Sequence, residues 1–133
     1  MDLQELYRQK LLSADQAAAL IASDSDVAMG MAAAEPPALL EALARRAEAG
    51  TLEALRLWYF HSMEHAGRTV LRPDLLNRIR PHCMFMSRIE RALIKADPGA
   101  VEFVPVAFSE SPQLLARRGL DACVTMVSPM DQH

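Results

Sequence analysis

Five short apolar segments alternate along this chain with segments whose apolar residues have helical spacing. The apolar segments, which are the expected strands, are residues 26–31, 55–61, 82–87, 101–108 and 122–128. Strands that pair in parallel need a crossover between them, usually a helix, and buried parallel strands are apolar almost throughout. The alternation therefore predicts an α/β domain with a largely parallel sheet of about five strands, flanked by helices.

Capping residues and apolar spacing place the helices between these strands. The clearest helix is expected over 36–50, because proline is favoured in the first turn of a helix and glycine just past its last turn. An opening helix with Leu3, Leu6 and Tyr7 on one face precedes a second helix that Ser13 caps. Shorter helices are expected over residues 73–79, 89–96 and 112–117.

Two features of the carboxyl-terminal half predict an irregular, incompletely covered sheet. Pro105 lies inside the fourth expected strand and has no N–H to donate to a neighbour, so this strand is expected to be at an edge, bulged or irregular. The sequence ends shortly after the fifth strand, and no closing helix follows it. One face or edge of the sheet would then be uncovered, which favours a chain that is part of a longer polypeptide.

The composition indicates one folded domain and excludes several classes of protein. Of 133 residues, 51% are hydrophobic and 23% are charged, and the net charge is −3. This apolar content excludes a mainly disordered chain, and no uninterrupted apolar stretch reaches the ~18 residues of a membrane span. The first residues have no signal-peptide pattern, and the weak negative charge gives no reason to expect nucleic acid. We therefore expect a single cytoplasmic domain that binds neither nucleic acid nor a membrane.

The cysteines and histidines predict no metal site. Cys83 and Cys123 are far apart and belong to no Cys-x-x-Cys pair, so two buried or half-buried free thiols are expected. His61 and His65 have the i, i+4 spacing of metal ligands on a helix, but His61 ends an expected strand and no third ligand lies nearby. The arginines between residues 68 and 91 favour a solvated face or an interface over contacts with the phosphates of CoA.

Four segments, taken in order, resemble the acetyl-CoA hydrolase/transferase family, and in particular its 4-hydroxybutyrate and itaconate CoA-transferase branches. They are YRQKLLSA at 7–14, GMAAAEP at 30–36, FSESP at 108–112 and VSPMDQH at 127–133. The resemblance implies a CoA-transferase-like fold in which residues 1–133 form the amino-terminal α/β domain of a protein with two related domains. It also implies a homodimer or a larger assembly.

The resemblance further implies the chemistry. Family members move CoA from an acyl thioester to a second carboxylic acid, through a glutamate that becomes a glutamyl-CoA thioester. That glutamate belongs to the second domain, so it is expected beyond His133, and no catalytic residue is expected in this chain. CoA thioester is then a substrate and no bound cofactor is implied; itaconate, succinate and 4-hydroxybutyrate are the candidate acids. The alternatives are an acyl-CoA hydrolase and a non-catalytic α/β binding module.

Within this chain, the residues expected to bind substrate come first from the small-residue loop. Gly30, Met31, Ala32 and Ala33 would let an acyl carboxylate or an oxyanion approach backbone N–H groups next to a helix N-terminus. The alternative is an ordinary strand-to-helix turn. Glu35 would orient the substrate or, as we favour, serve as an acidic residue at a helix N-terminus.

A second candidate segment lies where the fourth strand is expected to end and a helix to begin. Ser109 and Glu110 would then lie at the sheet end where α/β proteins bind ligands. Alternatively, Ser109 or Ser111 is an N-cap and Glu110 belongs to the first turn. Ser128, Asp131 and His133 lie too close together for a catalytic triad, so a turn that the Asp131 side chain stabilises is expected there.

Overall fold

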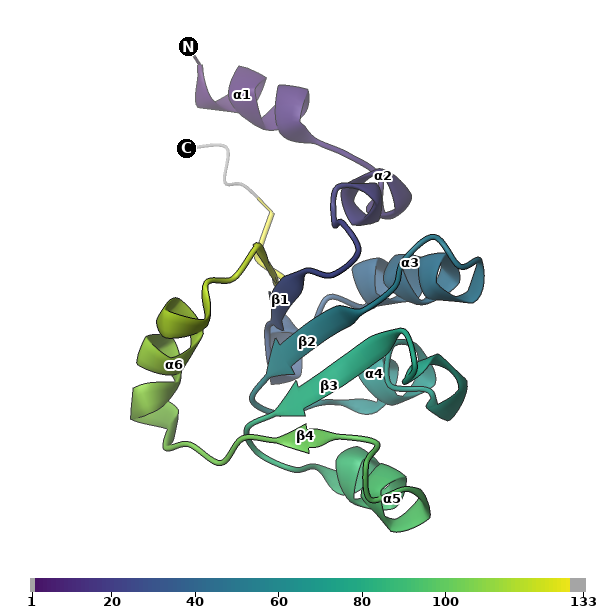
Figure 1. Cartoon of the computed structure of the whole chain (residues 1–133). Helices are drawn as coiled ribbons and strands as arrows, with labels where there is room; N and C mark the ends of the chain where they lie inside the picture. Colours follow the sequence, from purple (N-terminus) through teal and green to yellow (C-terminus); the bar gives the residue numbers. More distant parts are fainter. Residues whose placement is uncertain (1, 130–133) are drawn as a thin grey trace.

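The computed structural model describes residues 2–129 as a five-stranded parallel sheet with helices on both faces (Figure 1). The strand order is β4-β3-β2-β1-β5, and every neighbouring pair is parallel. The strands are β1 (Asp26–Met29), β2 (Leu55–Tyr59), β3 (Ile79–Cys83), β4 (Glu102–Phe103) and β5 (Ala122–Val124). The α/β class and the count of about five strands are confirmed.

The helices divide unequally between the two faces of the sheet. They are α1 (Leu3–Lys10), α2 (Ala14–Ala19), α3 (Pro37–Glu48), α4 (Glu64–Arg68), α5 (Arg88–Ala96) and α6 (Ser111–Arg118), with 3-10 turns η1 (Ala32–Ala34), η2 (Pro73–Leu75) and η3 (Phe108–Glu110). In Figure 1, α3, α4 and α5 lie on one side of the sheet and α6 on the other. Most residues of α6 are exposed, so it covers its face only in part.

The hydrophobic core lies between the sheet and α3. Alternate residues of a strand face the same way, and Val27, Leu55, Leu57 and Ile79, which point to this side, are completely buried. The i, i+3 pair Leu40 and Leu43 of α3 is also completely buried against them. The expected helix over 36–50 is thus confirmed, and its apolar stripe is what fixes it on the sheet.

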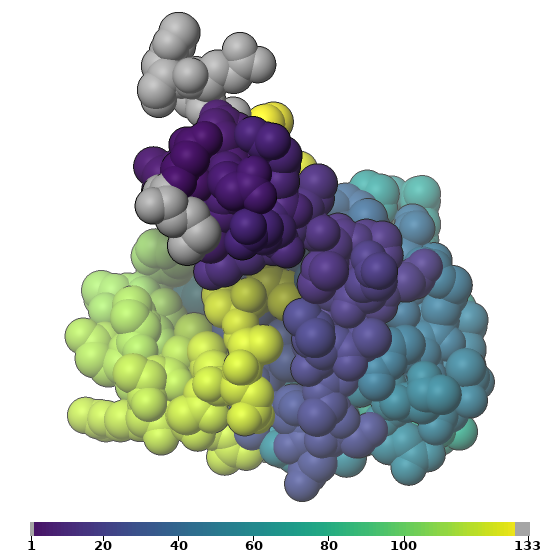
Figure 2. Space-filling model, turned by 90° about the horizontal axis from the view of Figure 1, so that it is seen from above, coloured from purple at the N-terminus to yellow at the C-terminus, as the bar shows by residue number. Residues whose placement is uncertain are grey.

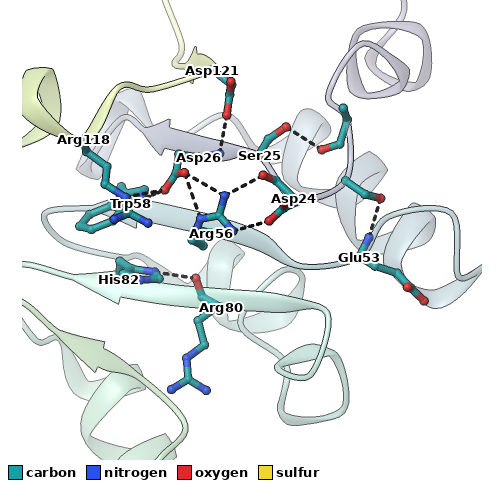
Figure 3. A network of polar contacts seen from close by, with 12 residues as sticks. Asp24, Ser25, Asp26, Glu53, Arg56, Trp58, Arg80, His82, Arg118 and Asp121 are labelled. Atoms are coloured by element: carbon teal, nitrogen blue, oxygen red, sulfur yellow. Dashed lines mark hydrogen bonds and ion pairs between the residues drawn. The ribbon is translucent and has the colours of Figure 1, made fainter.

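The opposite face of the sheet carries a polar network at the amino-terminal ends of the strands (Figure 3). The Asp26 carboxylate accepts hydrogen bonds from Arg56 Nε at 3.0 Å, Trp58 Nε1 at 2.7 Å and Arg118 Nε at 3.0 Å. Arg118 comes from α6, and its guanidinium lies 5.3 Å from the centre of the Trp58 ring, which stacks on His82. The network therefore attaches α6 to β1 and β2.

Burial and charge act in opposite directions on the ionisable groups of this network. Burial raises the pKa of Asp26, but the hydrogen bonds from Arg56, Trp58 and Arg118 outweigh it, and the pKa lies well below its usual range. Burial is the main cause that lowers the pKa of His82. Asp26 is therefore an ionised carboxylate that needs its cationic partners.

The third strand was predicted too far along the chain. It spans Ile79–Cys83 rather than 82–87, and the expected helix over 73–79 is only the turn η2. Pro81 makes this strand hard to recognise, because proline is rare in central strands. The proline is tolerated because its nitrogen faces the side of β3 on which β4 lies. Since β4 pairs only with His82 and Cys83, no β4 residue requires an N–H from Pro81.

Other boundaries differ by smaller amounts. The short helix α4 was not predicted, and the strand expected over 101–108 is reduced to Glu102–Phe103. This two-residue strand lies at the edge of the sheet and ends before Pro105, as the proline predicted. The turn expected around Asp131 and the end of the segment 127–133 lie outside the described residues.

The amino-terminal helix α1 has no buried residue, and its apolar side chains Leu3 and Tyr7 are exposed. Figure 2, which views the molecule from above, shows α1 (dark purple) in front of the yellow carboxyl-terminal segment. No helix within residues 2–129 is both long and apolar enough to pass through a bilayer.

Candidate functional site

The candidate site is the edge of the sheet at the carboxyl ends of the strands. In a parallel sheet all these ends meet at one edge, where ligands of α/β proteins bind. Here the edge is formed by the loops 30–36, 60–63 and 84–87, which follow β1, β2 and β3, and by residues 104–110 after β4. We call this set of loops the carboxyl edge.

Gly30 is required by the close packing of the first of these loops. A Cβ atom at this position would lie 2.5 Å from the Ala34 carbonyl oxygen and 2.5 Å from Thr125 Oγ1. The Gly30 N–H donates to the Val124 carbonyl, and the Met126 N–H donates to the Ala34 carbonyl. The close approach that this glycine permits is thus between its own loop and the end of β5.

The next residues of the loop are exposed and have unpaired backbone N–H groups. Met31, Ala32 and Ala33 are exposed, and Ala32 adopts a left-handed conformation with φ 51°. Neither the Ala32 nor the Ala33 N–H has an acceptor among residues 2–129. The N-terminus of helix α3 offers fewer N–H donors than expected, because Pro36 at its N-cap and Pro37 at its first position have no N–H. The unpaired N–H groups at this position therefore belong to the loop and not to the first turn of α3.

Glu35 is buried, with 3% of its surface exposed, and it belongs to the structure of the edge. Its Oε2 accepts from the Met63 N–H at 2.8 Å, and its Oε1 accepts from the Ala66 N–H at 2.9 Å. Both donors lie at the start of α4. The carboxylate is thus at a helix N-terminus, as we favoured, but that of α4 rather than that of its own helix.

A second buried carboxylate, Glu90, joins the loops after β2 and β3. It is completely buried and accepts from Tyr59 Oη at 3.0 Å, from the Ser87 N–H at 2.7 Å and from the Ser62 hydroxyl. Burial raises its pKa, but the hydrogen bonds from Ser62 and Ser87 outweigh this and hold the pKa below its usual value. Glu90 fixes the shape of the edge without facing solvent.

The groups around Glu90 are correspondingly hard to ionise. Burial, followed by the charge of Glu90, raises the pKa of the Cys83 thiol to about 12. The same causes raise the pKa of Tyr59 far above its usual value. Cys83 is therefore an inert buried thiol, as expected, whereas Cys123 is exposed rather than half-buried because it lies on the edge strand β5.

Aromatic side chains from three loops meet at the carboxyl edge. The Phe60 ring stacks on Phe85 with 5.9 Å between ring centres and meets Phe108 edge to face at 4.9 Å. His61 lies 5.7 Å from the Phe85 ring centre. Phe85 and Phe108 are 55% and 62% exposed, although large apolar side chains are usually buried. We call Phe60, His61, Phe85 and Phe108 the aromatic cluster.

Ser109 and Glu110 lie in the turn η3, directly after Phe108. Both are exposed, and the Phe108 contact with Phe60 brings their segment to the end of β2. Among residues 2–129, no hydrogen bond or ion pair connects either of them with Gly30 or Glu35. The N-cap of α6 is Glu110, without a side-chain cap, and the Ser111 hydroxyl instead donates to the Phe108 carbonyl. The expectation of a serine N-cap was wrong.

The remaining charged groups suit a solvated surface. Most of the arginines between residues 68 and 91 form ion pairs: Arg72 with Glu48 and Asp74, Arg78 with Glu53, Arg80 with Glu102, and Arg68 and Arg88 with Glu64. No group of three or more His, Cys, Asp or Glu side chains within residues 2–129 is arranged to hold a metal ion.

The comparison with known protein families agrees with this architecture. The model described as the acetyl-CoA hydrolase/transferase N-terminal domain matches residues 1–133. The chain belongs to the acetyl-CoA hydrolase/transferase family. The resemblance carried by the four segments is therefore confirmed, and this domain is the part of the family to which the chain corresponds.

Individual members of the family are longer than this chain. RipA from Yersinia pestis is 48% identical, with a TM-score of 0.94 over 100% of this chain and 32% of its own. A 4-hydroxybutyrate CoA-transferase from Porphyromonas gingivalis is 26% identical, with a TM-score of 0.66 over 98% of this chain and 28% of its own. The succinyl-CoA:cyclohexane-1-carboxylate CoA transferase of Geobacter metallireducens is 31% identical over 96% of this chain and 28% of its own length.

The sequence reasoning missed most of the aromatic cluster. Phe108 was noticed only within a turn motif, and His61 only as a rejected metal ligand. Three of the four phenylalanines of the chain belong to this cluster. Phe60 and Phe108 lie at the carboxyl ends of expected strands, which was a usable signal because such ends form the edge where α/β proteins bind ligands, whereas Phe85 was expected inside a strand.

Proposed function

We propose that this chain is the amino-terminal domain of a longer CoA-transferase and forms one wall of its active-site cleft. A second domain, beyond His133, supplies the nucleophilic glutamate. That glutamate attacks the acyl-CoA thioester, and an acyl anhydride forms as CoA leaves. The CoA thiolate then attacks the glutamyl carbonyl of the anhydride, which releases the original acyl group as a free carboxylate and leaves a glutamyl-CoA thioester. A second carboxylic acid takes the CoA from it. Itaconate, succinate and 4-hydroxybutyrate are the candidate acids.

The observation that carries this proposal is the surface of the carboxyl edge in a chain whose relatives include CoA transferases. The unpaired N–H groups of the exposed residues Ala32 and Ala33 are suitable donors for a developing oxyanion, which must be stabilised where the thioester reacts. The exposed rings of Phe85 and Phe108 offer an apolar wall. Such a wall protects an anhydride and a thioester from hydrolysis when a second domain covers it.

The carboxylates of this edge also support a nucleophile from outside the chain. Glu35 and Glu90 are buried, and both oxygens of each accept hydrogen bonds. Neither can reach a thioester without breaking the structure of the loops. Glu110 is exposed and remains a polar candidate for contact with substrate, together with Ser109.

The test is a trapping experiment on the complete polypeptide that the gene encodes. The protein is incubated with succinyl-CoA and treated with borohydride, which reduces a glutamyl thioester, and the modified residue is located by mass spectrometry. We expect one modified glutamate, outside residues 1–133. Modification of Glu35 or Glu110 would refute the proposed division of roles.

Transfer and hydrolysis are separated by the dependence on the acid. A transferase forms a new acyl-CoA only when itaconate, succinate or 4-hydroxybutyrate is added, whereas a hydrolase releases free CoA thiol without any acid. If neither product forms, the remaining interpretation is that the protein is a non-catalytic binding module.

The role of the loop is tested by a bulky substitution with a matched control. Ala33→Leu places a large side chain beside the unpaired N–H groups and should raise KM for the acyl-CoA or lower kcat by at least tenfold. Ala49→Leu makes the same change at the exposed carboxyl-terminal end of α3, at the opposite edge of the sheet from the loop, and should change neither. Equal activity of the two variants would exclude the loop from substrate binding.

A further inference from the structure

His61 has a hydrogen-bonding group that nothing in the structure satisfies. Its Nδ1 is buried and has no hydrogen-bond partner. Buried polar atoms are rarely left unpaired, so such an atom at a ligand-binding edge calls for an explanation. The residue as a whole is half-buried in the aromatic cluster, with the Phe85 ring at 5.7 Å.

The environment of Nδ1 decides which ring nitrogen carries hydrogen. An unpaired buried N–H is rarer in proteins than an unpaired acceptor, so the hydrogen belongs on Nε2. Nε2 also has no partner within residues 2–129, but unlike Nδ1 it is not enclosed. His61 therefore presents one accessible N–H donor, Nε2–H, in a wall otherwise made of phenylalanine rings.

A single hydrogen-bond donor that lies among apolar rings discriminates between ligands. A ligand that brings an acceptor satisfies Nε2–H, whereas a ligand that is apolar at this point covers the donor and leaves it unpaired, which weakens binding strongly. Phenylalanine rings have no hydrogen-bonding group, so the rings of Phe60, Phe85 and Phe108 would not distinguish carbon chains of the two kinds. His61 is the member of the cluster that distinguishes them.

We propose that His61 is a specificity-determining residue that selects acids with a second polar group. In this arrangement Nε2 donates a hydrogen bond to an oxygen at the end of the acid that does not react, while the reacting carboxylate faces the glutamyl thioester. The preferred acid is then a short dicarboxylate or hydroxy acid rather than a simple fatty acid. This inference rests on the proposed transferase function.

The test compares two four-carbon acids, succinate and butyrate, which differ in the group at the far end. With the complete polypeptide and acetyl-CoA as donor, kcat/KM is measured for each acid. We expect the wild type to prefer succinate and His61→Phe to lower the succinate/butyrate ratio about 10- to 100-fold. The change should come from KM for succinate, with KM for butyrate within twofold.

Two further variants separate recognition from damage to the fold. His61→Gln keeps an N–H donor and should restore part of the preference. His65→Phe makes the same substitution at an exposed residue four positions later and should leave the ratio unchanged. Circular dichroism shows whether each variant is folded.

The outcomes distinguish this inference from the proposed function. A succinate/butyrate ratio that His61→Phe changes by less than twofold overturns the role of His61 while transfer itself stands. If the wild type transfers CoA to neither acid, and not to itaconate or 4-hydroxybutyrate either, the proposed function fails. In that case, equilibrium titration of the same proteins with succinate tests the role of His61 by itself. Weaker succinate binding by His61→Phe than by the wild type supports the role. Equal binding by the two proteins, or no binding by the wild type, overturns it.

Discussion

Glu90 offers the sharpest test of what holds the carboxyl edge together, since it closes the capping box that Ser87 begins and also joins the loops after β2 and β3. Glu90→Ala removes the acceptor of the Ser87 N–H, of Tyr59 Oη and of the Ser62 hydroxyl. Ser62 can still bond Ser87 Oγ, which lies 3.1 Å away, so about two donors lose their partner. Each unpaired donor costs about 1–3 kcal/mol, and the cavity left by the side chain adds to this, so we expect Glu90→Ala to lower the free energy of unfolding by about 3–6 kcal/mol.

That loss is large against the stability of an ordinary domain, about 5–15 kcal/mol. Urea unfolding of the chain measures it, with fluorescence of the single tryptophan, Trp58, which is only 6% exposed, as the probe. Glu90→Gln should cost less, because the amide oxygen can accept from Ser87 while its NH₂ donates to the two hydroxyls. Tyr59→Phe removes one donor together with its bond and should cost about 1–2 kcal/mol.

The control is Glu41→Ala, which removes an exposed glutamate from α3 and should change stability by no more than about 0.5 kcal/mol. Acid gives a second measurement. The pKa of Glu90 is lowered by folding, so its contribution is complete above its ordinary value of 4.5 and is lost as the pH falls below it. If Glu90→Ala unfolds within about 1 kcal/mol of the wild type, the argument from its hydrogen bonds is wrong.

Two further predictions concern parts of the fold outside Glu90. Asp26→Asn weakens the bonds to Arg56 and Arg118 and should reduce stability at neutral pH. Because folding lowers the pKa of Asp26, the wild type loses this contribution as the pH falls below about 3.8, so the acid part of the pH–stability curve should be shallower in the variant. An unchanged curve would show that the network contributes nothing. Gly30→Ala should cost about 1–3 kcal/mol, because a Cβ would lie 2.5 Å from a backbone oxygen, and removing the Thr125 side chain should not restore the loss. Gly99→Ala, where the nearest atom is at 3.5 Å, is the matched control, and equal Tm values for the two variants would contradict the reasoning.

The fold class followed from patterns that are local in the sequence. The apolar stripe of α3 and the continuous apolar runs of β1 and β2 report which face of each element is buried, and this information does not depend on distant residues. Pro105 likewise predicted an irregular edge strand, because the missing N–H is a property of one residue. Pro81 shows the limit of such reasoning: whether a strand tolerates proline depends on where its neighbour begins.

The candidate site was predictable only in part. The loop 30–36 could be found because its small residues and the following prolines are consecutive. The hydrogen-bond partners of Glu35, the charged residue of this loop, could not be predicted, because one of them is 31 positions away. The same holds outside the site, where Arg118 donates to Asp26 across 92 positions. Nor could periodicity show that the loops after β2 and β3 would place Phe60, His61 and Phe85 together.

The sequence alone determined most of the secondary structure elements, their order and the buried face of α3, β1 and β2, because those properties depend on neighbours within a few residues; it missed α4 and misplaced β3. The tertiary structure decided which carboxylates are buried as structural acceptors and which aromatic side chains stay exposed at the carboxyl edge. The physical reason is that a hydrogen bond or a ring contact depends on distances across the sheet, and those distances are set by strand order and register rather than by separation along the chain.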